Sequence, residues 1–389
     1  MTFSTSSSGR RRSLAIGWLV ALTLACSGAS PQRAPLSSRQ PVADLPPEVP
    51  AGGRAARIAL LPPQNLTGTT FDEEALATRF EQALARAGLD VVSGAPVDAF
   101  LASRRIRFTG GLDREDAVAA GETLDVRGVL VTTVVQREEG SSPRLAVLAR
   151  LVSVDDDPSV YWMDGIAISG EDHRGLLELR LVHRVDRLER RAFSRLAGSL
   201  AEFLEGERTG GHRCSSGRRY RPSIVYRNLV PPKDRAVTIA VVPFQNRTQR
   251  EHAGEVASLQ LTRALAGIRG YRVLEPAVVR EEMLRRRIVV QEGVSRETVR
   301  MLRGGLEADY VIGGMVTRYD EARGAKGIPA VDVTVTMLET ATGRVAWHSR
   351  SEGRGNDGVV LFDLGTIRNT EELSCRLLAQ VADGLSGKR

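Results

Sequence analysis

Two long stretches of the chain carry the same succession of apolar and polar positions. Each begins with a short apolar run, Ile58 to Leu61 or Val237 to Val242, that ends at a proline and opens a polar loop. Apolar residues at helical spacing follow, and later in each stretch apolar and polar residues alternate, which indicates strands. In the first stretch the pattern predicts strands at 58–61, 89–92, 128–135, 144–154 and 159–168, and helices at 73–84, 95–105, 113–124 and 188–204. In the second it predicts strands at 237–242, 271–274, 310–317, 330–339 and 344–351, and helices at 256–265 and 370–385 among others.

The two stretches are copies of one another. RIALLPPQNLT (57–67) matches TIAVVPFQNRT (238–248), and the motif Arg-Arg-Ile returns in phase at 104–106 and 286–288. Trp162 corresponds to Trp347 at a slightly larger offset, which indicates a small insertion in the second copy. Two copies of this size predict tandem domains, because a solenoid is built from shorter repeats.

Each copy has the element order β-α-β-α-α-β-β-β-α. Parallel strand pairs require crossover helices, whereas hairpins pair antiparallel. Because each copy contains both kinds of connection, we expect an α/β fold with two tandem domains, each a mixed β-sheet covered by helices. Since each copy has its own strands, helices and hairpins, we also expect each to fold when expressed alone.

The second copy resembles a known periplasmic domain. The opening VVPFQN, the strand GYRVLE and the later ADYVIGG (Ala308–Gly314) are similar to a domain shared by three kinds of protein. These are the curli-secretion (CsgG-like) lipoprotein, the lipoprotein activators of penicillin-binding proteins, and the N-terminal domain of the Tol-system β-propeller protein. The first copy departs from the pattern, with Pro63 in place of the Phe and Val-Arg-Gly (126–128) in place of Ala-Asp-Tyr. The resemblance implies a domain that binds proteins or assembles into rings.

The first residues predict export. Arg10 to Arg12 form a positive segment, and the apolar run that follows to Ala25 is too short for a stable membrane span, as in a secretory signal. The stretch LTLAC, which ends at Cys26, resembles the lipobox of bacterial lipoproteins, in which the cysteine is lipidated and becomes the mature N-terminus. The alternative is an ordinary signal peptide with an incidental cysteine.

The chain thus divides into five segments. We expect a lipoprotein-type signal peptide at 1–26 and a disordered tether at 27–56, which is rich in Pro, Ser, Ala and Gly. The first α/β domain is expected at 57–207 and the second at 236–389. Between them, 208–235 is predicted to be a basic linker.

The charge and the predicted compartment limit the kinds of partner that the protein can bind. The formal net charge of +7 comes mainly from arginine, and acidic residues are interspersed along the chain, as on a solvated surface. Export excludes nucleic acid as a partner. Cys214 and Cys375 are able to pair in an oxidising compartment, or to remain two separate thiols.

No motif for catalysis stands out. The five histidines are scattered without Cys or His at metal-ligand spacing. The segment His212–Arg219 has a Cys and several Arg but lacks the spacing of a phosphatase loop, and it has no Lys-Ser/Thr for a phosphate-binding loop. We therefore expect no enzyme activity, no cofactor and no metal.

Two groups of residues are candidates for binding a protein partner. The first is a basic group in the linker, which is otherwise a solvated connection: Arg218, Arg219 and Arg221. The second lies in the strand-to-helix loop of the second copy, where its first member alternatively fills the core: Phe244, Asn246 and Arg247.

The sequence predicts a lipid-anchored protein at the periplasmic face of the outer membrane. It would act without catalysis as a binding or assembly factor of the cell envelope, held to the membrane by the lipid on Cys26. Its partner would be another envelope protein, and an oligomer is possible. The alternative is a subunit of an outer-membrane secretion channel similar to the curli-secretion lipoprotein. A third hypothesis, a small-molecule-binding enzyme, has no residues to support it.

Overall fold

A computed structural model describes residues 50–172, 182–214, 218–228, 235–288, 293–322, 327–358 and 365–387. Residues 40–389 form one compact unit. The predicted signal peptide, Cys26 and most of the predicted tether lie outside the described residues. Within the described ranges, no helix has the length and apolar character needed to cross a membrane.

The first domain is built on a mixed sheet with the strand order β3-β1-β4-β5-β6, and β2 pairs with β4 off this path. The strand β1 is parallel to both its neighbours, β3 and β4, whereas β4, β5 and β6 form antiparallel hairpins. The strands are β1 (Ile58–Leu60), β2 (Gln64–Asn65), β3 (Val91–Val92), β4 (Gly128–Glu138), β5 (Arg144–Val152) and β6 (Val160–Ser169).

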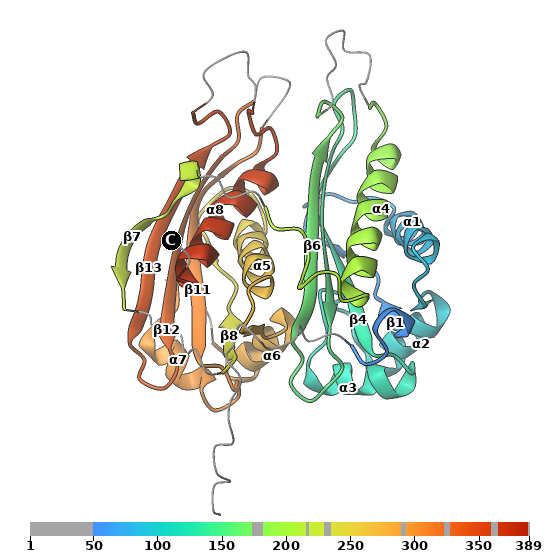
Figure 1. The fold of residues 1–389 in the computed structure, drawn as a ribbon, viewed down its shortest axis with the longest axis horizontal. Helices are drawn as coiled ribbons and strands as arrows, with labels where there is room; N and C mark the ends of the chain where they lie inside the picture. Colours follow the sequence, from blue (N-terminus) through green and yellow to red (C-terminus); the bar gives the residue numbers. More distant parts are fainter. Residues whose placement is uncertain are drawn as a thin grey trace, which may run out of the picture. The chain divides into compact units, whose positions relative to one another are not determined.

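Four α-helices complete this domain. They are α1 (Glu73–Arg86), α2 (Ala95–Arg104), α3 (Arg114–Thr123) and α4 (Val185–Leu204). The helix α1 begins where the side chain of Asp72 accepts a hydrogen bond from the backbone N–H of Ala75, which satisfies an otherwise free donor. Figure 1 shows α1 and α4 on one face of the sheet, where the rings of Phe80 and Phe193 stack with centroids 4.8 Å apart.

The second domain repeats this plan. Its sheet has the order β10-β8-β11-β12-β13-β7, with β9 pairing with β11. Its strands are β8 (Val237–Val241), β9 (Gln245–Asn246), β10 (Tyr271–Val273), β11 (Tyr310–Asp320), β12 (Ala330–Glu339), β13 (Val345–Arg354) and β7 (Ser223–Arg227). Its helices are α5 (Ala253–Ala266), α6 (Pro276–Arg285), α7 (Arg296–Leu302) and α8 (Thr370–Leu385). The predicted fold class, two mixed sheets each packed with helices, is confirmed.

The segment 208–235, expected to be a linker, is partly folded onto the second domain. It contributes the short 3-10 helix η3 (Arg218–Tyr220) and the strand β7, which pairs antiparallel with β13. It also contributes Cys214, which forms a disulfide with Cys375 on α8 at a Cα–Cα distance of 5.9 Å. Of the two alternatives left open by the sequence, the structure has the paired cysteines.

The helix α5 is buried on nearly all sides, unlike its counterpart α1. Twelve of the 14 residues of α5 are buried, compared with four of the 14 residues of α1. A helix buried all round has to pack against two surfaces. The second surface is the first domain, because α5 contacts β6 as well as β11 of its own sheet. Apolar residues of both domains, including Leu148, Met163 and Leu259, consequently belong to one core cluster.

The sheet faces of the two domains differ in the same way. On β5 and β6, the positions paired across the strands include Leu148 with Gly165 and Ala146 with Ala167. At the same place on β12 and β13, Thr334 pairs with Arg350 and Asp332 pairs with Glu352. All nine residues of β5 are buried, whereas β12 alternates between buried and half-buried positions over much of its length. The first sheet is therefore built to be covered on both faces, and the second is not.

Buried ion pairs join the two domains. Arg150 of β5 is 1% exposed and contacts both carboxylate oxygens of Glu275, which is fully buried; the shortest distance, from Nη2 to Oε1, is 2.7 Å. Arg263 of α5 donates to Asp164 of β6 at 2.8 Å. The backbone joins in as well, since the N–H of Glu275 donates to the carbonyl of Pro158 at 2.9 Å. In an isolated copy, each of these charged side chains would lose its ion-pair partner, and the apolar surface around it would be exposed to water. We therefore expect an isolated copy to be destabilised, contrary to the expectation from the sequence.

Candidate protein-binding surface

The strand β7 presents an apolar surface to solvent. Ile224, Val225 and Tyr226 are 45%, 69% and 46% exposed, and three of the five exposed large apolar residues in the described part of the chain are these three neighbours. Val, Ile and Tyr favour strands, so the run Ser-Ile-Val-Tyr-Arg forms one after Pro222. Contiguous exposed apolar residues mark interaction sites more often than scattered ones do.

The position of β7 leaves one of its edges open. It is the last strand in the order of the second sheet, and only its pairing with β13 is found among the described residues. The register shifts between the pairs His348–Tyr226 and Ser349–Ile224, so Val225 lies at a β-bulge. Bulges are common at sheet edges, where they twist the strand and change the direction of side chains. An open edge with apolar side chains is a place where another chain can dock.

Basic side chains surround this strand. Arg221 is exposed, Arg219 donates to the carbonyl of Gly358 at 2.9 Å, and Arg227 lies over the ring of Trp347 at 5.8 Å. We call the β7 surface the set Arg219, Arg221, Ile224, Val225, Tyr226 and Arg227. Of the basic group predicted from the sequence, Arg219 and Arg221 belong to it. The side chain of Arg218 lies outside the described part of the structure.

Tyr220 fixes the start of this surface. Its side chain is 3% exposed, belongs to the core of the second domain and donates from its hydroxyl to the carbonyl of Arg354 at 3.4 Å. Arg219 also lies over the Tyr220 ring, at 5.9 Å from the centroid. The buried tyrosine thereby holds its arginine neighbours at the surface of the domain.

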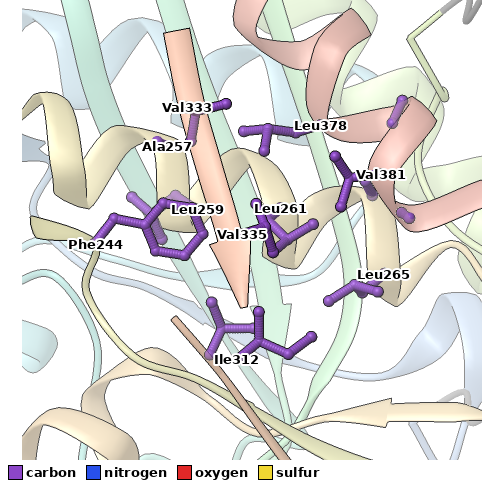
Figure 2. Close-up of a cluster of buried hydrophobic side chains, with 14 of the residues drawn as sticks. Phe244, Ala257, Leu259, Leu261, Leu265, Ile312, Val333, Val335, Leu378 and Val381 are labelled. Atoms are coloured by element: carbon purple, nitrogen blue, oxygen red, sulfur yellow. The ribbon is translucent and has the colours of Figure 1, made fainter. Parts of the chain in front are cut away.

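Phe244 is part of the core rather than of a surface. It is 5% exposed and lies among the apolar side chains of α5 and β11 (Figure 2). The chain approaches Phe244 closely at Gly254 and Gly314, because a Cβ added at either glycine would collide with Phe244. The alternative considered from the sequence, a core residue, is the one that the structure has, and we remove Phe244 from the candidate binding residues.

Asn246 has a structural role that explains the sequence repeat. Its Oδ1 accepts from the N–H and the hydroxyl of Thr248 at 2.9 and 2.8 Å, and its Nδ2 donates to the carbonyl of Arg250. Asn65 makes the same bonds to Thr67 in the first domain, at 3.0 and 2.8 Å. An asparagine that bonds the backbone two residues ahead stabilises a turn. The repeated Asn-x-Thr therefore preserves a loop shape and carries no chemistry of its own.

Arg247 is exposed but lies away from the β7 surface. It follows β9, which pairs with β11, whereas β7 lies beyond β12 and β13. The four strand spacings from β9 to β7 correspond to about 19 Å. Arg247 instead lines a groove of about 780 Å³ together with Arg250 and the end of β11. The sequence-predicted residues thus do not converge on one site.

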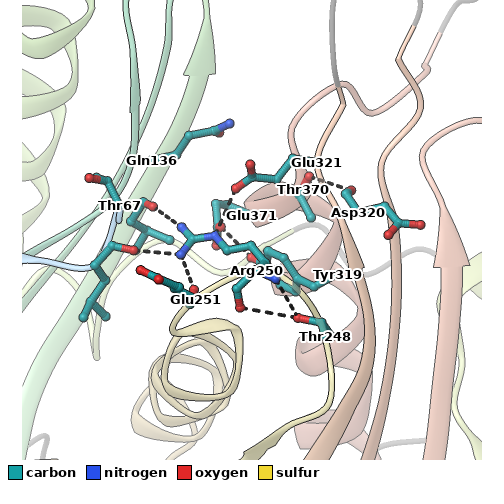
Figure 3. Close-up of polar contacts among 12 residues, drawn as sticks. Thr67, Gln136, Thr248, Arg250, Glu251, Tyr319, Asp320, Glu321, Thr370 and Glu371 are labelled. Atoms are coloured by element: carbon teal, nitrogen blue, oxygen red, sulfur yellow. Dashed lines mark hydrogen bonds and ion pairs between the residues drawn. The ribbon is translucent and has the colours of Figure 1, made fainter. Parts of the chain in front are cut away.

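Arg250 connects the two domains beside this groove. It donates to the carbonyls of Leu66 and Val135 in the first domain, at 2.8 and 2.6 Å, and to Glu321 at 3.0 Å (Figure 3). Its side chain is only 9% exposed. Because its donors are engaged within the chain, we assign Arg250 to the interface between the domains and not to a partner.

One cluster has the residue types of a hydrolase but not their arrangement. Ser199 and His212 both donate to Asp164, at 2.6 and 2.8 Å, so the serine is bonded to the carboxylate and not to the imidazole. Burial alone would raise the pKa of Asp164, but Arg263 and these hydrogen bonds outweigh burial and hold the pKa below its usual value. The described residues contain no group of His, Cys, Asp and Glu suited to a metal ion.

The chain has similarity to known proteins in its structure and not in its sequence. No protein-family model and no curated protein sequence matches the chain. The structure is similar to PelC from Paraburkholderia phytofirmans, described as a dodecamer, with 21% identity, a TM-score of 0.28, and coverage of 39% of this chain and 87% of PelC. It is similar to the lipoprotein GNA1162 from Neisseria meningitidis, with 21% identity, a TM-score of 0.27, and coverage of 38% and 99%. The C-terminal domain of LpoB from Salmonella enterica matches with 15% identity, a TM-score of 0.25, and coverage of 31% and 87%.

Proposed function

We propose that this protein is a lipid-anchored periplasmic factor that acts without catalysis and binds another protein of the cell envelope through the β7 surface. The observation that carries the proposal is the run of three exposed apolar residues on an open sheet edge, with arginines on both sides. Apolar side chains at the centre and charges at the rim are the usual composition of a protein interface. The arginines favour a partner with acidic residues near the contact.

The anchoring part of the proposal rests on the sequence. The arginines, the short apolar run and Cys26 follow one another as in exported lipoproteins, and the Pro-rich tether would separate the folded unit from the membrane. The lipid would hold the protein at the periplasmic face of the outer membrane. The resemblance to periplasmic lipoprotein domains supports the same assignment.

A ring or channel subunit is the weaker candidate. The face of the first sheet opposite α1 and α4 is already covered by α5 of the same chain. On the second sheet the corresponding positions are polar, including Thr334, Thr336 and Arg350. If a second copy of the chain packed a helix on this face of the second sheet, it would bury these charged and hydroxyl groups. Burying them is unfavourable unless they gain hydrogen-bond partners.

The proposal is tested by charge reversal in the full-length protein. Tagged protein is purified from envelope extract at low and high salt, and the captured proteins are identified for wild type, Arg219→Glu/Arg221→Glu and Arg247→Glu. Because the partner is expected to be acidic at the contact, the double variant should lose a partner that wild type captures at low salt, and Arg247→Glu should retain it. Loss of the partner only with Arg247→Glu, or equal capture by all three proteins, would contradict the proposal.

A further inference from the structure

The helix α4 carries three arginines in a line along its exposed side. Arg187, Arg191 and Arg195 are spaced four residues apart, and all three are exposed. In the part of the chain that the structure describes, their side chains make no hydrogen bond and no ion pair. The rise of an α-helix makes this line about 12 Å long. We call these three residues the α4 stripe.

No acidic residue of the described chain pairs with the α4 stripe. Glu189, for example, is buried, and it accepts from Arg137 at 2.9 Å. Asp172, near the stripe, accepts from the backbone N–H of Ser169 at 2.7 Å. All three acids of α4 pair with arginines outside the stripe: Asp186, Glu189 and Glu202. The stripe therefore presents three positive charges to its surroundings.

These charges are unfavourable for the helix itself. Like charges four residues apart on a helix repel one another. Arg187 also lies in the first turn of α4, where the positive end of the helix dipole disfavours a cation. In the second copy the corresponding charges are neutralised, because Glu372 stands in the place of Arg191 and pairs with Arg376, the counterpart of Arg195. The stripe is thus a feature of the first copy alone, and the fold does not require it.

The composition around the stripe indicates what binds there. The exposed side chains between the three arginines are those of Arg190 and Ser194. Among the described residues, none of the exposed large apolar side chains lies on α4. A protein interface normally has an apolar centre, which this surface lacks. An anionic lipid surface attracts basic side chains by charge alone, so a row of arginines without apolar neighbours fits a bilayer better than a protein.

The start of the folded part lies beside the same helix. The short 3-10 helix η2 (Gly53–Ala55) contacts α4, and Arg54 forms an ion pair with Glu205 at the C-terminal end of α4. Arg195 lies about 14 Å along the helix axis from that end. The chain between Cys26 and Pro50 extends at most about 85 Å. A lipid on Cys26 would therefore hold α4 close to the bilayer, which raises the effective concentration of lipid at the stripe.

We propose that the α4 stripe docks on the anionic phospholipid surface of the bilayer that anchors the protein. The inference rests on the anchoring part of the proposed function and not on the β7 surface. Each guanidinium donates to lipid phosphate oxygens, a pairing that arginine makes readily. Because α5 covers the face of the first sheet opposite α4, docking places the second domain on the side of the first sheet away from the membrane. The β7 surface is then free to meet a partner in the periplasm.

The test is flotation of the purified full-length protein with vesicles, in a Cys26→Ala background so that no lipid on the protein contributes. One set of vesicles is phosphatidylcholine alone, and the other also contains phosphatidylglycerol. We expect tighter binding to the anionic vesicles, and the difference should shrink at high salt. Each arginine at an anionic surface strengthens binding about fivefold, so Arg187→Gln/Arg191→Gln/Arg195→Gln should weaken binding to these vesicles about a hundredfold.

A second triple variant removes the same charge from exposed arginines of the second domain that have no partner among the described residues: Arg247→Gln/Arg296→Gln/Arg344→Gln. It should bind the anionic vesicles nearly as wild type does. The melting temperature of the stripe variant should equal or exceed that of wild type, because repulsion along α4 is relieved.

The inference is overturned if wild type binds both kinds of vesicle equally, if the stripe variant binds the anionic vesicles like wild type, or if the second variant loses as much affinity. A lower melting temperature of the stripe variant would also overturn it, because the arginines would then serve the fold. The vesicles contain no protein and Cys26 is replaced, so none of these outcomes depends on the β7 surface or on lipidation.

Discussion

Removing the carboxylate of Glu275 should destabilise the whole folded unit. In Glu275→Ala the guanidinium of Arg150 stays buried at 1% exposure with only the carbonyl of Gly110, at 2.6 Å, as a partner. Breaking a buried ion pair by deleting one member costs about 3–5 kcal/mol, because an unpaired charge remains. The loss of Glu275 as the N-cap of α6 adds to this cost. We therefore expect the free energy of unfolding to fall by at least about 3 kcal/mol.

The assay is urea unfolding followed by circular dichroism, with the change taken from the shift in midpoint at constant slope. The control Glu281→Ala breaks an exposed pair with Arg285, at 3.3 Å, and should change stability by at most about 0.5 kcal/mol. Replacing both partners, as Arg150→Met/Glu275→Leu, should recover most of the loss, because no charge is left buried. A loss below about 1 kcal/mol in Glu275→Ala would refute the assignment of this pair to the interface.

Three further predictions concern other parts of the chain. Burial raises the pKa of Glu371 from 4.5 to about 7 in the folded protein. Because the folded protein holds this proton more tightly than the unfolded chain does, the contribution to the free energy of unfolding is fully present below about pH 4.5. It should decline by about 3 kcal/mol as the pH rises from there through about 7. Unfolding measured across this range should show the decline in wild type and not in Glu371→Gln, and a flat wild-type profile would count against it. Gly111→Ala should be strongly destabilising, because φ is +131° and a Cβ would meet Oε1 of Glu275 at 2.3 Å. The control is Gly293→Ala at the corresponding position of the second copy, where φ is +85° and the space is open, so it should lower the melting temperature less. A larger drop in Gly293→Ala than in Gly111→Ala would be contrary evidence. Cys26→Ala should release the protein from the membrane fraction or block its processing, whereas equal membrane association would remove the lipid anchor.

The repeat made the fold accessible from the sequence. Apolar spacing predicted the helix at 370–385, which the structure has as α8 with the same bounds, and the hairpin strand at 330–339, which is β12. These elements depend on local periodicity and turn residues, and both are written in a short window of sequence. The strand β7 carries a similar local signal in Ile-Val-Tyr, but it lies within a segment rich in arginine, and that composition is typical of a solvated linker.

The packing of the two domains was harder to predict because it depends on pairs far apart in the chain. Nothing near Arg150 in sequence points to Glu275, and nothing near Asp164 points to Arg263. A weaker signal was present, since the first copy has Leu-Ala-Val-Leu-Ala (145–149) where the second has a regular apolar–polar alternation. A strand without alternation is expected to be covered on both faces, and this would have indicated that the first sheet receives a second layer.

The candidate site was predicted only in part for a similar reason. Asn246 stood out because it recurs as Asn65 in the first copy, and Phe244 because it belongs to the family-like opening VVPFQN of the second copy; both residues hold the fold. The β7 surface is not repeated in the first copy and owes its exposure to the order of strands in the sheet, which the sequence alone did not give.

The most direct test of partner binding at the β7 surface places a photoreactive amino acid at Val225 in the full-length protein within intact cells. The matched control position is Leu284, which is 63% exposed compared with 69% for Val225 and lies on α6 instead of β7. If the β7 surface binds a protein partner, illumination should join the protein at position 225 to one envelope protein, and this adduct should be absent at position 284. No adduct at position 225, or the same adducts at both positions, would contradict the claim that the β7 surface binds a protein partner.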